Sequence, residues 1–238
     1  TDSYATAYEP FDGREFDDAV VFLPTPYGEW LNHPFQSLRN DPGFDGEVVY
    51  ATSTRELAVA GAYPDRTLYR YVYRGRWAPT VGATVTPRLQ HVKRVTGQRV
   101  RVDVTAGVPA YTELVSVQVG NGSSGAATVT DPGERLRFAV VVENGTATVS
   151  GPAFDDAVRV PVDGRETVPV TLLVDDGTVS TFSYEVAVPV DATSDGVTVL
   201  TPRLEVCRSP LRCGGEAAYA PGEHRPGVAL NVSLSATN

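Results

Sequence analysis

The feature that most constrains the fold is a series of valine-rich segments that fills the chain from about residue 100 to its end. Apolar and polar residues alternate within these segments, as in strands with one buried and one exposed face. Turn signals such as Asp131-Pro132-Gly133 and Asp163-Gly164 separate the segments at intervals of roughly 8–14 residues, a spacing typical of antiparallel sandwiches. We therefore predict an Ig-like antiparallel β-sandwich over residues 81–238, with strands at 100–105, 113–119, 126–130, 136–143, 146–150, 157–162, 167–174, 178–190, 197–205 and 228–235.

The first 80 residues follow a different pattern. Residues 19–23 (AVVFL) and 47–51 (EVVYA) are short continuous apolar runs, which are typical of strands buried on both faces. Ser and Thr at 52–54 precede a short helix that ends before Pro64, and residues 67–73 form a third strand, expected nearer the edge of the sheet. This order predicts a small, mostly parallel α/β layer at 1–80, joined to the sandwich by a Pro-, Thr- and Gly-rich linker at 76–85.

Charge excludes two classes of partner. The chain of 238 residues has a formal net charge of −9 and a pI near 4.8. Nucleic-acid binding and electrostatic membrane anchoring both need clustered Lys and Arg, and no such run is present in the sequence, so we expect no nucleic-acid partner. Lys93 is the only lysine among the 20 basic residues, and this composition indicates a GC-rich genome, such as that of an actinobacterium or a haloarchaeon.

Several features favour an exported protein. Cys207 and Cys213 are separated by five residues that include Pro210, a spacing that suits a small disulfide loop, and disulfides persist in oxidising compartments. Free thiols are the alternative, and the histidines are too few nearby for a metal site. Three N-x-S/T sequons, at Asn121, Asn144 and Asn231, are candidate glycosylation sites. No apolar run reaches 18 residues, and the chain starts at Thr1, so we expect a processed product or an excised soluble piece.

The loop that follows the first strand is the richest candidate for a binding site. In open α/β sheets, ligands bind beyond the carboxyl ends of the strands, which is where this loop begins. Its aromatic residues could stack on a sugar ring, while its Asn, Asp and His side chains could bond hydroxyl groups. The alternative is a packed loop whose polar groups make local turns. The candidate ligand-binding residues are Tyr27, Trp30, Asn32, His33, Asn40 and Asp41.

Catalysis is a weaker hypothesis. His33 could act as a general base oriented by Asp41 or Asp45, but the sequence holds no G-x-S-x-G element and no cysteine nearby, so we assign no catalytic residues. Residues 50–54 (YATST), followed by a helix and LYRYVYR, resemble mono-ADP-ribosyltransferase toxins, although the family's earlier arginine and later Gln/Glu-x-Glu pair are missing. Glu29, Asp41, Asp45 and Glu47 do not form a calcium loop, and we expect no metal or cofactor.

The same part of the chain resembles a known family more closely. Its elements are the strand at 20–22, Asn40-Asp41-Pro42, residues 45–51, Tyr63-Pro64-Asp65-Arg66 and the strand at 69–73. Together they resemble the soluble C-terminal domain of prokaryotic, above all haloarchaeal, multi-spanning membrane proteins related to the dolichyl-phosphate-mannose–protein mannosyltransferases. The resemblance covers under a quarter of the chain. It implies that the catalytic part lies in a transmembrane region outside this sequence.

These observations predict an extracytoplasmic, non-catalytic domain of a membrane-anchored envelope protein of the glycosyltransferase type. Its expected partners are the parent transmembrane region and a glycan or glycoprotein acceptor that it binds or positions. A structural cell-surface sandwich that mediates protein contacts is the first alternative, and an ADP-ribosyltransferase-like enzyme is the second.

Overall fold

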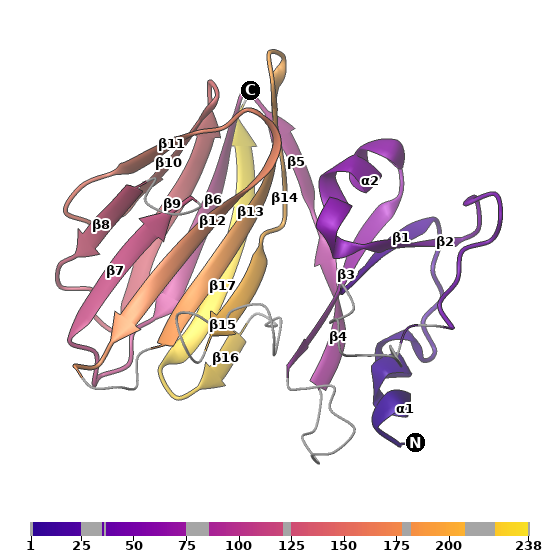
Figure 1. Ribbon diagram of the computed structural model, residues 1–238, viewed down its shortest axis with the longest axis horizontal. Coiled ribbons are helices and arrows are strands. Elements are labelled where there is room, and N and C mark those ends of the chain that lie inside the picture. The colour runs from indigo at the N-terminus through magenta and orange to yellow at the C-terminus, as the bar shows by residue number, and fades with distance from the viewer. Residues whose placement is uncertain are drawn as a thin grey trace. The chain divides into compact units, whose positions relative to one another are not determined.

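The computed structural model describes residues 2–24, 35, 37–74, 86–120, 125–177, 182–207 and 222–237. The chain divides into two compact units, and the boundary between their described parts lies between Val92 and Lys93. Most of the described residues are in strands (Figure 1). No helix in the described ranges is long and apolar enough to cross a membrane. The predicted linker at 76–85 lies outside the described residues.

The first unit is built on a four-stranded sheet in the order β2-β1-β3-β4. β1 (Ala19–Leu23) pairs in parallel with β2 (Val48–Thr52) and β3 (Thr67–Arg74), whereas β4 (Thr86–Val92) pairs antiparallel with β3. β3 is therefore an inner strand, and its predicted position nearer the edge is wrong because β4 covers it. The helices are α1 (Asp2–Tyr8), η1 (Glu9–Phe11), η2 (Ser53–Arg55) and α2 (Glu56–Ala62).

Both faces of this sheet are covered, which explains why all five residues of β1 are buried. On one face, Val21, Leu23 and Tyr71 pack in a cluster with Ala7 of α1 and with Phe35. Aromatic rings dominate this cluster: Tyr71 stacks on Phe11 and meets Phe35 edge-on, with ring centroids 4.6 Å apart. On the other face lies α2, which buries Glu56 and Ala60.

The second unit contains two antiparallel sheets, and this all-β, sandwich-like part confirms the predicted strand-rich class. The sheets have the orders β11-β10-β9-β6-β17-β16 and β5-β14-β13-β12-β7-β8, with β15 also paired to β13. The strands of the first sheet are β6 (Arg99–Gly107), β9 (Arg135–Glu143), β10 (Thr146–Ser150), β11 (Val158–Pro161), β16 (Gly222–Arg225) and β17 (Val228–Thr237). Those of the second sheet are β5 (Arg94–Gly97), β7 (Leu114–Val119), β8 (Gly125–Val129), β12 (Gly164–Asp175), β13 (Phe182–Thr193), β14 (Gly196–Leu200) and β15 (Arg203–Cys207).

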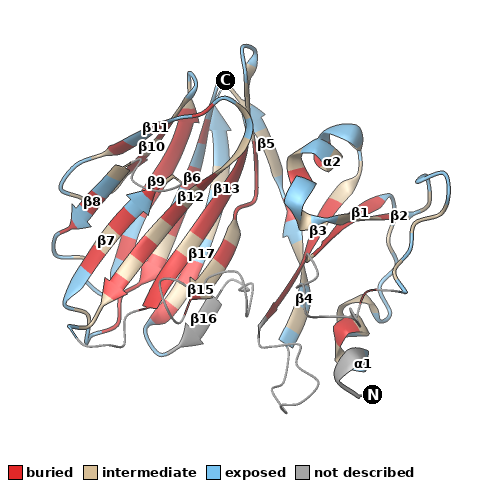
Figure 2. Ribbon diagram, viewed as in Figure 1, coloured by how far each residue is buried: buried red, intermediate tan, exposed pale blue. Residues whose placement is uncertain are grey.

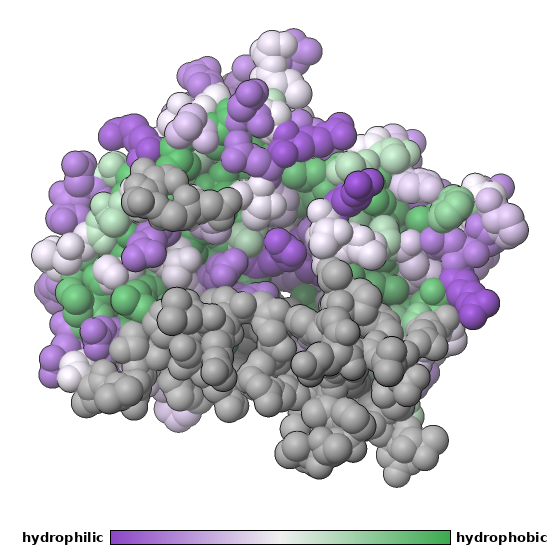
Figure 3. All heavy atoms as spheres, in the orientation of Figure 1, coloured by the Kyte–Doolittle hydropathy of each residue, from purple (hydrophilic) through white to green (hydrophobic). Residues whose placement is uncertain are grey.

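Valine fills the core between these two sheets. Buried and exposed residues alternate along many of these strands (Figure 2). Along β6, Val100, Val102 and Val104 face inward while Arg99, Arg101 and Asp103 face outward. The Tyr184 hydroxyl of β13 donates a buried hydrogen bond of 2.7 Å to the Gly107 carbonyl of β6, which ties one sheet to the other. Hydrophilic and hydrophobic residues are interspersed over the described part of the face drawn in Figure 3.

Candidate functional site

The predicted binding loop begins after β1, at the carboxyl end of the parallel strands. Tyr27, Trp30, Asn32 and His33 lie outside the described residues, so their binding role stays a prediction. The hypothesis of a catalytic His33 and the calcium hypothesis for Glu29 fall in the same gap. Two of the predicted ligand-binding residues, Asn40 and Asp41, are described.

Asn40 uses both ends of its amide on the backbone of β2. Its Nδ2 donates to the Tyr50 carbonyl at 2.8 Å, and the Tyr50 N–H donates to its Oδ1 at 2.7 Å. A side-chain amide that accepts and donates in this way is held in one orientation. The structure therefore places Asn40 in contact with the strand backbone.

Asp41 organises the turn that leads into β2. Its Oδ1 accepts the Gly46 N–H at 3.0 Å, and its Oδ2 accepts the N–H groups of Gly43 and Asp45 at 3.2 and 3.4 Å. Hydrogen bonding with Asp45, and then with Gly46, holds the pKa of the Asp41 carboxyl below its ordinary value. Asp41 thus stays ionised near neutral pH as the acceptor that shapes this turn.

A buried ion pair in the first unit was not predicted from the sequence. Arg70 of β3 donates from Nε and Nη2 to the two carboxylate oxygens of Glu56, at 2.7 and 2.6 Å. Both side chains are at most 4% exposed, and Arg70 Nη1 also reaches Gln90 Oε1 at 3.3 Å. The paired groups fasten α2 to the sheet. The signal in the sequence is Arg70 itself, since it shares a strand face with the apolar residues Leu68 and Val72.

The Ser and Thr run that suggested an ADP-ribosyltransferase continues from the end of β2 into η2. Within this run, the hydroxyls of Thr52 and Thr54 share a hydrogen bond of 3.0 Å. The strand-then-helix order of this segment agrees with the predicted secondary structure. The enzymatic hypothesis stays a prediction.

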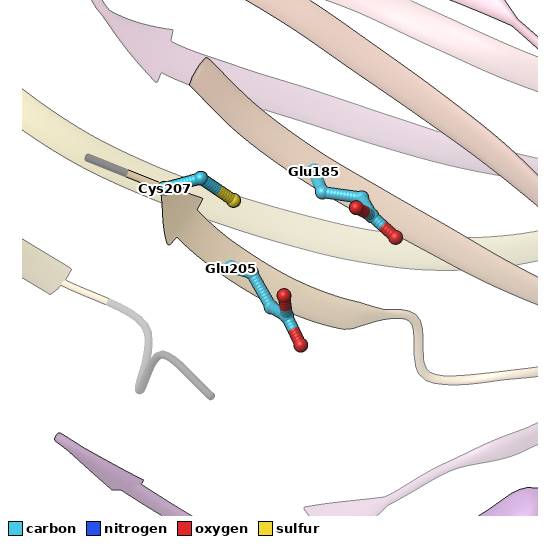
Figure 4. A group of neighbouring side chains, drawn as sticks. All are labelled: Glu185, Glu205 and Cys207. Atoms are coloured by element: carbon cyan, nitrogen blue, oxygen red, sulfur yellow. The ribbon is translucent and has the colours of Figure 1, made fainter. Parts of the chain in front are cut away.

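One cluster in the second unit brings together Glu185 of β13 with Glu205 and Cys207 of β15 (Figure 4). Glu185 lies directly opposite Glu205 in the strand pairing, and the possible ligand atoms of the three residues are within 4.8 Å of one another. Cys207 is not a free thiol, so its sulfur is not available as a thiolate ligand. The remaining feature is a pair of carboxyl side chains that lie opposite each other on neighbouring strands.

The Glu185 carboxyl is expected to make stability depend on pH. Burial raises its pKa, and nearby Arg203 opposes this only in part. The unfolded chain ionises the group near its ordinary pKa of 4.5, whereas the folded chain holds the proton to higher pH, so the free energy of unfolding falls as pH rises from about 4.5 through the folded pKa. Glu185→Gln should remove this fall, as measured by urea unfolding at a series of pH values. The exposed Glu134→Gln is the control, and an unchanged pH profile in Glu185→Gln would contradict the assignment.

A groove of about 430 Å³ lies on the outward face of the six-stranded sheet. Its outward-facing lining comes from three neighbouring strands, with Asp103 of β6 opposite Ala139 of β9, and Ala139 opposite Ser150 of β10. Ala139 is 2% exposed and is the small residue between these two polar side chains. The other lining residues are Arg101, Val104, Thr105, Arg137, Phe138, Gly151 and Pro152.

The backbone also shapes this groove. A Cβ atom on Gly151 would lie 2.6 Å from the Arg137 carbonyl oxygen and 3.0 Å from Phe138 Cβ, so only glycine lets the chain after β10 approach β9 this closely. The groove is open to solvent, and its volume falls within the range of small-molecule sites in proteins. The sequence did not reveal the groove, because its lining residues come from three strands whose register the sequence leaves open.

Comparison with known families gives one match. Residues 19–188 match the family described as "Domain of unknown function (DUF7846)". The chain belongs to this family. The match runs from β1 into β13, so the family region includes residues of both units. No curated protein and no solved structure matches the chain.

Proposed function

We propose that this member of the DUF7846 family is a non-catalytic recognition domain that binds or positions a glycan or a protein acceptor. The observation that carries the proposal is the groove on the outward face of the six-stranded sheet, where Asp103, Ser150 and Arg137 offer hydrogen-bond donors and acceptors around the small Ala139. Sugar hydroxyls need such paired donors and acceptors. In this proposal the second unit is an Ig-like sandwich that carries the site, and the first unit is an α/β layer.

The parent protein in this proposal is a membrane-anchored envelope protein of the glycosyltransferase type, and the domain lies on the extracytoplasmic face. The resemblance of residues 18–75 to the soluble domains of such proteins supports this. Two of the sequons are accessible, since Asn144 is exposed in the two-residue turn between β9 and β10, and Asn231 is exposed on β17. Asn121 lies outside the described residues.

A disulfide between Cys207 and Cys213 is part of the proposed location. Cys213 lies outside the described residues, but it is the only other cysteine in the chain. We expect protein from the native host to resist alkylation until it is reduced, and its intact mass to exceed the sequence mass by glycans on Asn144 or Asn231. Alkylation of the unreduced, denatured protein at either cysteine would contradict the disulfide. An intact mass equal to that of the bare chain would contradict the glycans.

The proposed function is tested by binding to a panel of glycans. We expect the wild-type domain to bind at least one glycan, and Ala139→Leu to weaken that binding about tenfold or more, because the larger side chain fills the groove. Ala126→Leu, at an exposed position on β8, is the matched control and should bind like the wild type. Thermal unfolding should confirm that both variants fold.

A second variant separates the groove from the loop predicted from the sequence. If Trp30→Ala abolishes binding and Ala139→Leu does not, the site lies at the loop after β1 and not at the groove. If the wild-type domain binds no glycan, the structural cell-surface module becomes the better description. Consumption of NAD by the purified domain would instead support the enzyme alternative.

A further inference from the structure

The outward face of the six-stranded sheet is basic in a chain whose formal net charge is −9. The outward positions of β6, β9, β10, β11 and β17 alternate with the core positions. Among their described side chains are two acidic residues, Asp103 and Glu143, and five arginines, Arg99, Arg101, Arg135, Arg137 and Arg159. Positive charge is thus concentrated on one face of a protein that is acidic as a whole, and such a face attracts anions.

Two of these arginines are paired. Arg101 Nε donates to Asp103 Oδ1 at 2.8 Å, and Arg99 Nη1 lies 3.9 Å from Glu143 Oε2. The guanidinium groups of Arg135, Arg137 and Arg159 have no ion-pair or hydrogen-bond partner among the residues that the structure describes. Arg137 lines the groove, so a guanidinium group without such a partner in the described part of the chain lies at its edge.

Most of the neutral polar side chains on the described part of this face are hydroxyls, and Asn231 adds an amide. Thr105 and Ser150 line the groove, and Asn231 of β17 lies opposite Thr105 in the strand pairing. The outward positions continue with Ser233 and Ser235 on β17 and with Thr146 and Thr148 on β10. A face that combines unpaired guanidinium groups with many neutral hydrogen-bonding side chains matches a ligand that carries both carboxylate or sulfate groups and hydroxyls.

We propose that this face binds an acidic polysaccharide, with a uronate or sulfated sugar seated in the groove. This inference rests on the proposed glycan recognition and specifies the ligand class. The anionic group contacts Arg137, whose planar guanidinium can hold a carboxylate with two hydrogen bonds. Sugar hydroxyls contact Asp103, Thr105 and Ser150, and the ring lies over Ala139. A membrane surface or a nucleic acid would use the charge but would have no need of the concave, hydroxyl-lined floor.

The test compares two ligands that differ only at their carboxyl groups: an oligogalacturonate and its fully methyl-esterified form, measured by titration calorimetry. We expect the acid to bind and the ester to bind at least tenfold more weakly. Arg137→Ala should weaken binding of the acid about tenfold or more and binding of the ester much less, since the hydrogen bond that is lost to the acid involves a charged group. Affinity for the acid should also fall with added salt. Arg55→Ala, an exposed arginine of the first unit, is the matched control and should bind like the wild type.

The outcomes separate this inference from the proposed function. Equal binding of acid and ester, unaffected by Arg137→Ala, overturns the acidic ligand but leaves glycan recognition standing. If neither form binds and no glycan of the panel binds, both the inference and the proposed glycan recognition are overturned. Binding to anionic phospholipid vesicles or single-stranded DNA at least as tight as to the oligogalacturonate, and unaffected by Ala139→Leu, shows a simple charge effect and overturns the inference.

Discussion

Replacing Glu56 with leucine is expected to lower the free energy of unfolding of the first unit by about 3–5 kcal/mol, because the buried charge of Arg70 loses the carboxylate that balances it. Both side chains are at most 4% exposed, and two hydrogen bonds of 2.6 and 2.7 Å join them. The two opposite charges are therefore buried together. Arg70→Met should cost a similar amount, for the same reason on the carboxylate side.

The double variant Glu56→Leu/Arg70→Met makes this prediction sharper. With both charges replaced by apolar groups of similar size, most of the lost stability should return, since neither side chain is left without a partner. Hydrogen exchange at the backbone amides of β1 and β3 during urea unfolding measures the stability of this unit separately from that of the second. Additive losses in the double variant would show that the two side chains stabilise the unit independently.

Tyr71→Ala is expected to lower the free energy of unfolding of the first unit by about 3–5 kcal/mol, as for other large buried aromatic residues. Tyr71 is 2% exposed, stacks on Phe11 with centroids 6.0 Å apart, and meets Phe35 edge-on. Its hydroxyl donates to the Ala7 carbonyl at 2.8 Å, and burial raises the pKa of this phenol so that it remains a donor.

Tyr71→Phe separates the contribution of the Tyr71 ring from that of its hydroxyl, and Tyr111→Ala is the control. Tyr71→Phe keeps the ring contacts and leaves the Ala7 carbonyl without this donor, so it should cost about 1–3 kcal/mol. Tyr111→Ala, at a tyrosine of the second unit that is 50% exposed, should change stability by less than about 0.5 kcal/mol. If Tyr71→Ala costs no more than Tyr111→Ala, the aromatic cluster does not stabilise the unit in the way described.

The strands of the second unit were predictable because one face of each is buried. In β6 and β9, valine or another apolar residue occupies every inward position, so the pattern in the sequence is the pattern of burial. The residues at which the strands begin and end were harder to predict. A single strand predicted at 197–205 is in fact β14 and β15, which end and begin on either side of Thr201-Pro202, and proline cannot donate to the sheet.

Other elements of the first unit lacked a local signal. The segment TPRLQHV of β4 alternates only weakly and contains Pro87, and it becomes a strand because β3 offers it an open side with which to pair. The strand at 67–73 was predicted, but no feature of that segment pairs Arg70 with Glu56, which lies on α2. Pairings between distant residues of this kind depend on tertiary structure, which a pattern along the chain does not contain.

The candidate site shows the same limit more strongly. Asn40 and Asp41 were selected as polar residues in a strand-end loop, and the structure shows what their side chains contact: the backbone of β2 and of the turn before it. The groove, by contrast, depends on the register that puts Asp103, Ala139 and Ser150 in one row. None of these three residues stands out in the sequence, since serine, alanine and aspartate alternate with valine in many exposed strands.

The amide contact of Asn40 has a consequence for the behaviour of the protein at high concentration. β2 stands at the end of the strand order, and its backbone groups at Tyr50 point away from β1. An open strand of this kind is a template on which a second molecule can add its own strand and begin to aggregate. The Asn40 side chain bonds the N–H and the carbonyl of Tyr50, as a residue of an added strand would. These two backbone groups are therefore not available to a second molecule. Asn40, which was predicted to bind a ligand, thus occupies two backbone groups of β2 that face away from β1.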